Sequence, residues 1–306
     1  MTRIAAIGTF VPETGLDNFR EGLRFDIDQK FIRDKIGFTN TSRKAPGKKA
    51  SDLCLAAWHD LKRQVPDMPP PELVLVCTQN PDQRIPHTAM FVHQKLGLPE
   101  SCDCMDISLG CSGYVSTLSL AVGYMRLNSL RTGLVFTADP YSEILDPGDR
   151  NTWLLFGDAA TVTLLRDEGE LTLGPVTSVS VSGEHGALSC PPGGVLYMDG
   201  RRIFNFAMRY VPRSIDACLK REGLRREDVD VYLLHQASGY LVENLRQRLG
   251  IPKERAPFEA EAAGNTVSST LPMLLKNRLT DKTLKKILLC GFGVGLSVAT
   301  ALMRRS

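Results

Sequence analysis

Residues 106–125 read DISLGCSGYVSTLSLAVGYM, a short strand pattern followed by a long helical one rich in small residues. A helix that directly follows a buried strand is the repeating unit of α/β proteins. Cys111 lies at the junction, where the free N–H groups of a helix N-terminus would stabilise a thiolate. We therefore expect a lowered thiol pKa and a nucleophilic Cys111. A buried structural cysteine would fit this stretch about equally well.

The composition is that of an ordinary globular protein. The 306 residues are 43% hydrophobic and 23% charged, and the net charge of +3 is too small to favour nucleic acid as a partner. The N-terminal MTRIAAIGTFVP is too short in its apolar part for a signal peptide. No apolar run approaches the roughly 18 residues of a membrane span. We expect a cytoplasmic protein with no membrane or nucleic-acid partner.

The eight cysteines predict neither disulfides nor a metal site. With no export signal, most of them should be reduced and buried. Cys102 and Cys104 have the spacing of metal ligands, but no second ligand pair accompanies them. We expect these two to be small core residues on a buried strand, and we expect no metal.

Strand and helix patterns alternate along the chain, which predicts βαβ units and buried parallel sheets. Apolar, β-branched segments such as ELVLVCTQ, GLVFTAD and KKILLCGFG read as strands. Helical periodicity lies between such segments. The expected helices span residues 51–64, 88–96, 112–128, 204–222, 239–249 and 267–279.

The two halves of the chain resemble each other weakly. FGDAATVTLLR closes the first half and FGVGLSVATALMRR the second, each as a Phe-Gly turn that leads into an apolar strand. This favours a duplicated α/β unit. We expect an N-terminal half at residues 1–167, which carries the cysteine, and a C-terminal half at residues 168–306. Each half should have its own equivalent parallel sheet.

Three further motifs put polar or glycine residues at strand or helix ends. His235 follows a strand in LLHQAS, and the carboxyl ends of parallel strands often carry chemistry. Asn265 precedes a helix in AAGNTVSSTLP, where it is either a helix cap or an amide donor to a substrate. The glycines of residues 291–295 leave N–H groups free to stabilise an oxyanion. Each signal is weak alone, and His235 fits a non-catalytic role equally well.

These motifs, in this order, resemble those of β-ketoacyl–acyl carrier protein synthase III, a condensing-enzyme branch of the thiolase-fold superfamily. DISLGCSGY resembles the active-cysteine motif, LLHQAS the histidine motif and GNTVSSTLP the asparagine motif. DPGDRNTWLLFGDAA resembles the coenzyme A loop, and GFGVGLSVATALMR the last glycine loop and strand. The resemblance covers essentially the whole chain. It implies an α/β thiolase fold, five-layered αβαβα with two pseudo-repeated halves, and a homodimer.

The resemblance implies a two-step acyl transfer in fatty acid biosynthesis with no cofactor, because acyl-CoA is a substrate. Cys111 would take the acyl group as a thioester. His235 and Asn265 would hold the carbonyl of malonyl–acyl carrier protein while it loses carbon dioxide, and the resulting carbanion would attack the thioester. The backbone N–H groups of Cys111 and Val294 would stabilise the second oxyanion. Val294 stands where the family usually has glycine.

The coenzyme A groove carries over with changes. Phe31 and Lys35 stand where the family has a tryptophan and an arginine, so stacking survives but bidentate phosphate binding does not. Arg150 matches a second phosphate-binding arginine of the family. Phe204 matches an aromatic residue at the mouth of the pantetheine tunnel.

Departures from the family pattern concern the partners. Ser238 and Tyr240 replace an asparagine that shapes the tunnel and an arginine that docks the carrier protein. Arg246 and Arg248, on the same expected helix, would keep part of a basic docking face. Ile85 stands where a family residue, often a bulky aromatic one, reaches across the dimer to bound the partner's acyl pocket. The smaller Ile85 predicts primers longer than acetyl.

Two rival functions remain. Relatives of the same fold transfer acyl groups to alcohols or amines without decarboxylation, but they commonly lack the asparagine, so Asn265 favours condensation. An inactive subunit that only pairs with an active partner is disfavoured by the intact Cys111, His235 and Asn265. These residues leave open the primer length, the choice between primary fatty-acid and secondary-metabolite pathways, and whether the malonyl donor is on carrier protein or coenzyme A.

Overall fold

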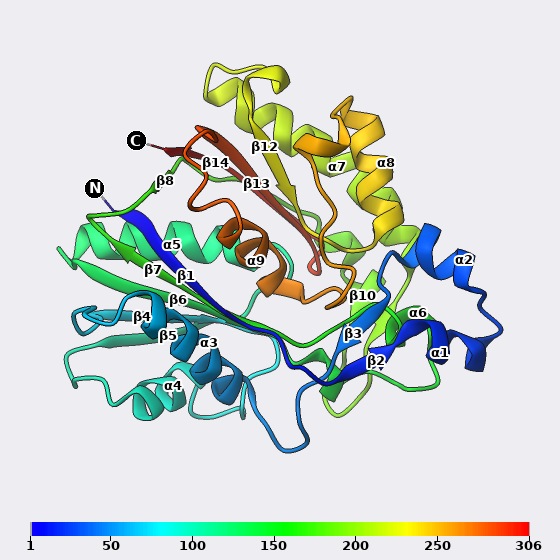
Figure 1. The fold of residues 1–306 in the computed structure, drawn as a ribbon, viewed down its shortest axis with the longest axis horizontal. Helices are drawn as coiled ribbons and strands as arrows, with labels where there is room; N and C mark the ends of the chain where they lie inside the picture. The colour runs from blue at the N-terminus through cyan, green and yellow to red at the C-terminus, as the bar shows by residue number, and fades with distance from the viewer. Residues whose placement is uncertain (1, 306) are drawn as a thin grey trace.

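Five alternating layers of helix and sheet make up the protein (Figure 1). The computed structural model describes residues 2–305. The first-half strands are β1 (Arg3–Phe10), β4 (Leu73–Cys77), β5 (Asp103–Ile107), β6 (Thr132–Ala138) and β7 (Ala160–Arg166). The second-half strands are β8 (Leu171–Leu173), β9 (Thr177–Ser180), β12 (Val231–Leu234), β13 (Lys286–Gly293) and β14 (Ser297–Arg305).

Three pairs of helices form the other layers. The first outer layer consists of α3 (Ala50–Gln64) and α4 (Thr88–Leu96), and the second of α7 (Gly200–Arg221) and α8 (Gly239–Leu249). The central layer, between the first-half and second-half strands, consists of α5 (Gly113–Leu127) and α9 (Thr270–Lys276) (Figure 1). The expected five-layered αβαβα fold is confirmed.

The expectation of two separate parallel sheets is wrong. The strand order is β12-β13-β14-β8-β1-β7-β6-β4-β5, and β9 also pairs with β14, so one path of hydrogen bonds joins ten strands. The halves meet at a single residue pair, Ile4 with Leu171. The sheet is mixed, because β7 runs antiparallel to β6 and β1, and β14 runs antiparallel to β13. A direct return without a helical crossover, as between β13 and β14, produces an antiparallel pair.

The central helices hold the two halves together. Tyr114, Leu118, Ala121 and Met125 of α5 are buried in one cluster with strand residues of both halves. A helix that carries apolar and small residues on most sides is typical of such a position. The predicted boundary between residues 167 and 168 falls in the connection between β7 and β8, and the division into two units stays a prediction.

A smaller lobe lies beside α8 at one end of the molecule (Figure 1). It contains β2 (Gly15–Asp17), α1 (Asn18–Gly22), α2 (Gln29–Phe31), a π-helical turn (Ile32–Ile36), β3 (Asn40–Ser42) and α6 (Arg150–Trp153). Ile32, Ile36, Phe38 and Leu154 form its own buried cluster. Within residues 2–305, none of the helices combines the length and apolar character needed to cross a membrane.

Candidate active site

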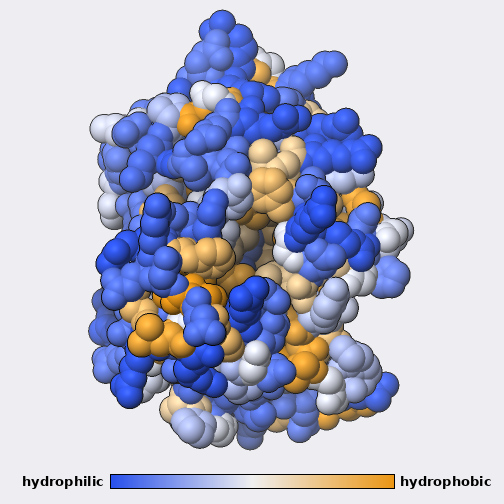
Figure 2. Space-filling view, turned by 90° about the vertical axis from the view of Figure 1, so that its right-hand side faces the viewer, coloured by the Kyte–Doolittle hydropathy of each residue, from blue (hydrophilic) through white to orange (hydrophobic). Residues whose placement is uncertain are grey.

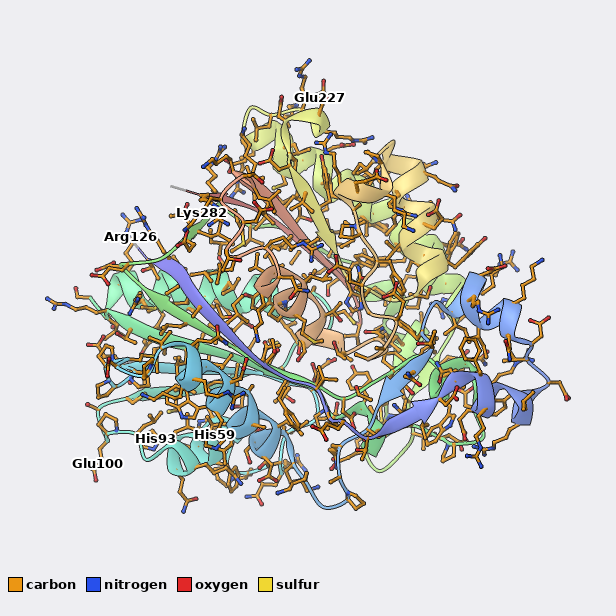
Figure 3. All side chains as sticks on the ribbon, in the orientation of Figure 1. His59, His93, Glu100, Arg126, Glu227 and Lys282 are labelled. Atoms are coloured by element: carbon orange, nitrogen blue, oxygen red, sulfur yellow. The ribbon has the colours of Figure 1, made fainter. Side chains whose placement is uncertain are left out.

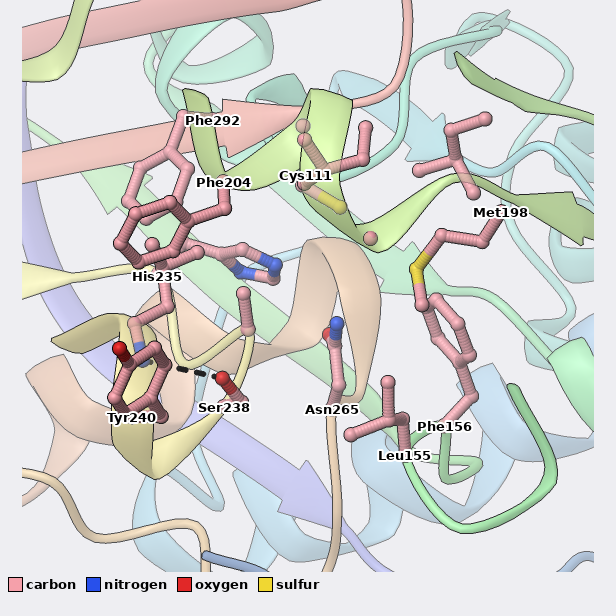
Figure 4. A pocket seen from close by; sticks show the side chains of 16 residues that line it. Cys111, Leu155, Phe156, Met198, Phe204, His235, Ser238, Tyr240, Asn265 and Phe292 are labelled. Carbon is pink, nitrogen blue, oxygen red and sulfur yellow. Dashed lines mark hydrogen bonds between the residues drawn. The ribbon is translucent and has the colours of Figure 1, made fainter. Parts of the chain in front are cut away.

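A mostly apolar cavity of about 250 Å³ brings together the side chains of Cys111, His235 and Asn265 (Figure 4). Its other walls include aromatic and aliphatic residues from both halves, among them Leu155, Phe156, Leu188, Met198, Phe204 and Phe292. In Figure 4 the three polar side chains face one hollow from different elements. Sequence positions 111, 235 and 265 therefore meet at a single site.

Cys111 lies two residues before the first residue of α5, with Ser112 as the N-cap residue. The glycine loop at the end of β13 packs directly against it. A Cβ atom on Gly293 would lie 2.7 Å from the Cys111 sulfur, so only glycine fits there. The expected strand-to-helix junction is confirmed, and the last glycine loop forms one wall of it.

The expected low thiol pKa is wrong for the unoccupied cavity. Burial raises the pKa of Cys111 to about 12, and the nearby Asp139 charge adds to the increase. Backbone hydrogen bonds from Val294 and from Cys111 itself lower this pKa but do not outweigh burial. The free-energy cost of removing a thiolate from water is larger than the stabilisation that two N–H donors provide. The resting thiol is therefore protonated.

His235 is a neutral, unpartnered imidazole. It is 1% exposed, and burial lowers its pKa to about 3. Neither ring nitrogen has a hydrogen-bond partner, and the ring meets the edge of Phe292 with centroids 5.5 Å apart at 87°. A neutral imidazole keeps one N–H donor and one acceptor. A buried polar group without a partner is costly, so the ring is set to bond with whatever enters the cavity.

Asn265 is held in one orientation by both halves of the chain. Its backbone N–H donates to Leu155 O at 2.8 Å, and its backbone oxygen accepts from Gly157 N at 3.0 Å. The side-chain oxygen accepts from Val267 N at 3.0 Å. This bond leaves the amide NH₂ as the free end, so Asn265 offers the cavity a donor. Asn265 precedes the first turn of its helix but bonds to the next residues rather than capping α9.

A second pocket of about 500 Å³ forms the entrance to the cavity. Phe31, Lys35 and Arg150, the three residues expected to bind coenzyme A, all line it. It shares four wall residues with the inner cavity: Leu155, Met198, Gly200 and Ser238. Figure 2 shows this face of the molecule, hollowed near its centre, with hydrophobic residues in the hollow and hydrophilic ones around it.

Tyr240 connects the entrance to the inner cavity. The ammonium group of Lys35 lies 3.9 Å from the centroid of its ring, and the ring of Phe204 stacks on Tyr240 with centroids 5.7 Å apart. A cation over an aromatic face is attractive. Tyr240 therefore joins the expected Lys35 and Phe204 into one wall, although its only signal in the sequence was a departure from the family pattern.

Two of the remaining predicted residues lie outside the cavity. Ile85 is 80% exposed, in the loop before α4. Arg248 is exposed on α8. The labelled His59 and His93 lie on the first outer helix layer, far from the entrance (Figure 3).

Arg246, which we expect to help dock a carrier protein, is largely buried, and its docking role stays a prediction. Its side chain is 9% exposed and forms an ion pair with Glu243 of the same helix. Arg246 follows Val242 by one helical turn, and both lie on the side of α8 that packs inward. Arg248 remains the outward-facing candidate.

Residues 182–200 cover the cavity. They form a 3₁₀ segment (Ser182–Ala187) and a hairpin of β10 (Leu188–Ser189) and β11 (Tyr197–Met198), from which Leu188 and Met198 enter the lining. The glycines and prolines of this segment predict turns, but nothing in its pattern shows that it folds back over Cys111.

The cysteines other than Cys111 lie outside the cavity lining. All eight are free, Cys102 is buried, and Cys104 is half-buried on β5, an edge strand rather than the buried strand expected. Among the described residues, no group of three or more His, Cys, Asp or Glu side chains could hold a metal ion.

Comparison with known sequences finds one family. The family model described as 3-oxoacyl-[acyl-carrier-protein] synthase III matches residues 105–180, and the model of the C-terminal part of the same family matches residues 219–305. The first match contains Cys111, and the second contains His235 and Asn265.

Full-length relatives agree with this match. The chain is 30% identical to "Beta-ketoacyl-[acyl-carrier-protein] synthase III" of Koribacter versatilis, over 99% of this chain and 97% of the relative. It is 32% identical to "Beta-ketoacyl-[acyl-carrier-protein] synthase III 1" of Deinococcus radiodurans, over 98% and 93%. The crystal structure of the synthase III from Thermus thermophilus superposes with a TM-score of 0.91 at 28% identity, over 99% of this chain and 98% of that one.

Proposed function

The chain belongs to the β-ketoacyl-[acyl-carrier-protein] synthase III family, and from this we propose that Cys111, His235 and Asn265 are its catalytic residues. The family assignment makes the protein a condensing acyltransferase of fatty acid biosynthesis, not an enzyme that moves an acyl group to an alcohol or amine. The observation that supports the residue roles is the convergence of the three side chains on one buried cavity.

In the first step, the sulfur of Cys111 attacks the carbonyl carbon of acyl-CoA. The bond from that carbon to the coenzyme A sulfur breaks, and the thiol proton of Cys111 ends on the departing coenzyme A thiolate. Because the resting thiol is protonated, this proton must leave the cavity together with the leaving group. Ping-pong kinetics follow from the covalent intermediate.

In the second step, a malonyl thioester enters the emptied tunnel. We assign its carbonyl oxygen to the N–H of neutral His235 and the amide NH₂ of Asn265, two donors fixed before the substrate arrives. A well-placed donor of this kind is worth about 3 kcal/mol toward a developing oxyanion. Loss of carbon dioxide gives an enolate, which attacks the Cys111 thioester. The β-ketoacyl thioester leaves, and the sulfur recovers a proton.

The thioester on Cys111 needs an oxyanion site of its own when it is formed and when it is attacked. The backbone N–H groups of Val294 and Cys111 both lower the pKa of the Cys111 thiol, which places these donors on the side of the sulfur. Donors beside the sulfur are close to the carbonyl oxygen of an acyl group bonded to that sulfur. The backbone N–H of Val294 serves this purpose as well as that of glycine would.

The entrance pocket suits the nucleotide end of coenzyme A. Exposed Phe31 offers an aromatic face to adenine, and Lys35 and Arg150 offer cations to phosphates. The apolar walls further in, including Phe204, suit the pantetheine arm. We assign malonyl–acyl carrier protein as the second substrate, docked at the same entrance, with Arg248 among its contacts.

We also propose a homodimer formed along β5. This strand pairs only with β4, so one edge of the sheet is open within residues 2–305. Ile85, Met90 on α4 and Leu120 on α5 are exposed hydrophobic residues in neighbouring elements. An open edge flanked by exposed apolar side chains is typical of a strand that pairs with another chain. The cytoplasmic location and the absence of a cofactor stay predictions.

The proposal is tested by incubating the protein with a panel of acyl-CoAs, weighing the intact chain, and then adding malonyl–acyl carrier protein. We expect an acyl adduct that disappears as carbon dioxide and a β-ketoacyl thioester form. An adduct that moves to alcohols or amines, with no carbon dioxide released, would contradict the assigned chemistry.

A further inference from the structure

The turn that follows Asn265 is strained. Val267 has φ 53°, in the left-handed region that β-branched residues rarely adopt. It begins a 3₁₀ turn (Val267–Ser269) that leads into α9. Backbone strain of this kind persists only where the surrounding structure fixes the conformation. The conformation matters because the Val267 N–H is the group that orients the Asn265 side chain.

One carboxylate fixes the far end of this turn. Both the backbone N–H of Ser268, at 3.3 Å, and its hydroxyl donate to Asp139 Oδ2. Asp139 directly follows β6, and its other oxygen accepts from Gln79 N at 2.7 Å. The turn is therefore tied to the ends of two first-half strands through one side chain.

Asp139 is buried completely and has no ion-pair partner among residues 2–305. The three groups that donate to Asp139 are all neutral. They require a partner that only accepts hydrogen bonds, and an ionised carboxylate is such a group. An asparagine of the same shape would turn its NH₂ toward either Gln79 N or Ser268, where donors already point. A buried carboxylate with no cation beside it is costly, so its presence calls for a reason other than stability.

We propose that Asp139 is a positioning residue, which directs the amide of Asn265 into the cavity by holding the strained turn at Ser268. This inference rests on the proposed role of Asn265 in decarboxylation. Asp139 does not line the cavity and does not touch the substrate. Its effect should therefore be confined to the half-reaction that uses Asn265.

The test separates the two half-reactions in Asp139→Asn. Acylation of Cys111, followed by intact mass, should stay within about threefold of wild type, whereas carbon dioxide release from the malonyl donor should fall at least about tenfold. In Ser268→Ala, which loses the hydroxyl but keeps the backbone N–H, carbon dioxide release should fall less than in Asp139→Asn. In Ser268→Thr, which keeps a hydroxyl at this position, carbon dioxide release should be close to that of the wild type. Asp230→Asn is the matched control, because Asp230 also accepts from two backbone N–H groups, Lys285 N and Lys286 N, but does not line the cavity, and it should leave both half-reactions unchanged.

Equal losses in both half-reactions of Asp139→Asn would show a general structural role and overturn the inference, as would unchanged carbon dioxide release. If Asp139→Asn fails to fold, the Ser268 pair decides, and a threonine variant no better than the alanine one refutes the inference. Asn265→Ala is run in parallel. If it keeps carbon dioxide release, the proposed role of Asn265 fails; if it loses release while the Asp139 and Ser268 variants keep it, only the positioning role fails.

Discussion

Gly293 packs directly against Cys111, because a Cβ atom at position 293 would lie 2.7 Å from the Cys111 sulfur. The nucleophile is thus held where an incoming thioester must pass. Cys111→Ser should abolish the acyl adduct seen by intact mass, because an un-ionised serine hydroxyl is a far weaker nucleophile than a thiol. Cys190→Ser, which removes an exposed thiol, is the control and should keep the adduct. An adduct that persists in Cys111→Ser would place the nucleophile elsewhere.

His235→Ala and Asn265→Ala should acylate normally but lose decarboxylation. Each substitution removes one of the two proposed donors to the malonyl carbonyl, and the loss of one such donor lowers the rate about 10²–10³-fold. The measurement is carbon dioxide release from enzyme acylated beforehand. Release at the wild-type rate in both variants would point back to simple acyl transfer.

Two buried groups should make opposite contributions to the pH dependence of the stability between about pH 4 and 6. Burial lowers the pKa of His235 to about 3, so on acidification the unfolded chain takes up this proton first and the fold is destabilised. Burial raises the pKa of Asp139 to about 6, so on acidification the folded chain takes up this proton first and the fold is stabilised. Each contributes up to about 1.4 kcal/mol per pH unit.

Replacing one of these two residues should reveal the pH dependence of stability that the other contributes. Asp139→Asn should lose stability on acidification from pH 6 to 4 more steeply than wild type, and His235→Gln should lose it less steeply. Denaturant unfolding at three pH values measures both slopes. If the free energy of unfolding changed with pH in the same way in all three proteins, the two groups would not titrate as stated.

Ile85→Phe should shift primer choice toward acetyl. If Ile85 bounds the partner's pocket, each methylene that the wild type can bury adds about 0.8 kcal/mol, or roughly fourfold in affinity. The rate of Cys111 acylation across a chain-length series measures this. We expect the wild type to use chains longer than acetyl at least as well as acetyl. A wild-type optimum at acetyl that Ile85→Phe leaves unchanged would rule out the role of Ile85.

Arg150→Ala should raise the KM for acyl-CoA about tenfold and leave kcat nearly unchanged, since a phosphate contact far from the reacting carbon contributes uniform binding. The matched control is an acyl-pantetheine thioester, which lacks the nucleotide. Its KM should be the same for Arg150→Ala and the wild type. The effect should shrink at high salt, because the entrance is open to solvent. Equal losses with both substrates would place Arg150 outside the nucleotide site.

Four of the six expected helices, α3, α4, α5 and α8, match the structure to within two residues because their apolar periodicity is strong, whereas the short helices α1, α2 and α6 were not expected. The sequence missed the start of α7, where Gly200 and two arginines resemble a loop and only the cap at Asp199 marks a helix. It placed the catalytic candidates through motifs, but not the protonation of Cys111, because the burial of the thiol depends on distant segments such as the glycine loop that packs against it. The burial of Arg246 could have been predicted from the sequence, since Arg246 lies one helical turn from Val242 on the apolar side of α8. The link from Asp139 to Ser268 joins residues 129 positions apart and has no local signal.

The backbone bonds of Asn265 to Leu155 and Gly157 have a consequence for the lifetime of the chain before it is finished. A nascent polypeptide that has emerged only as far as Cys111 already carries the thiol, yet it has neither the wall that confines it nor the donors that face it. His235 is made when about three quarters of the chain has been translated, and Asn265 and the wall that contains Gly293 follow within about the last fifth. A chain that ends before Asn265 therefore lacks part of the proposed site, and we expect no condensation from it.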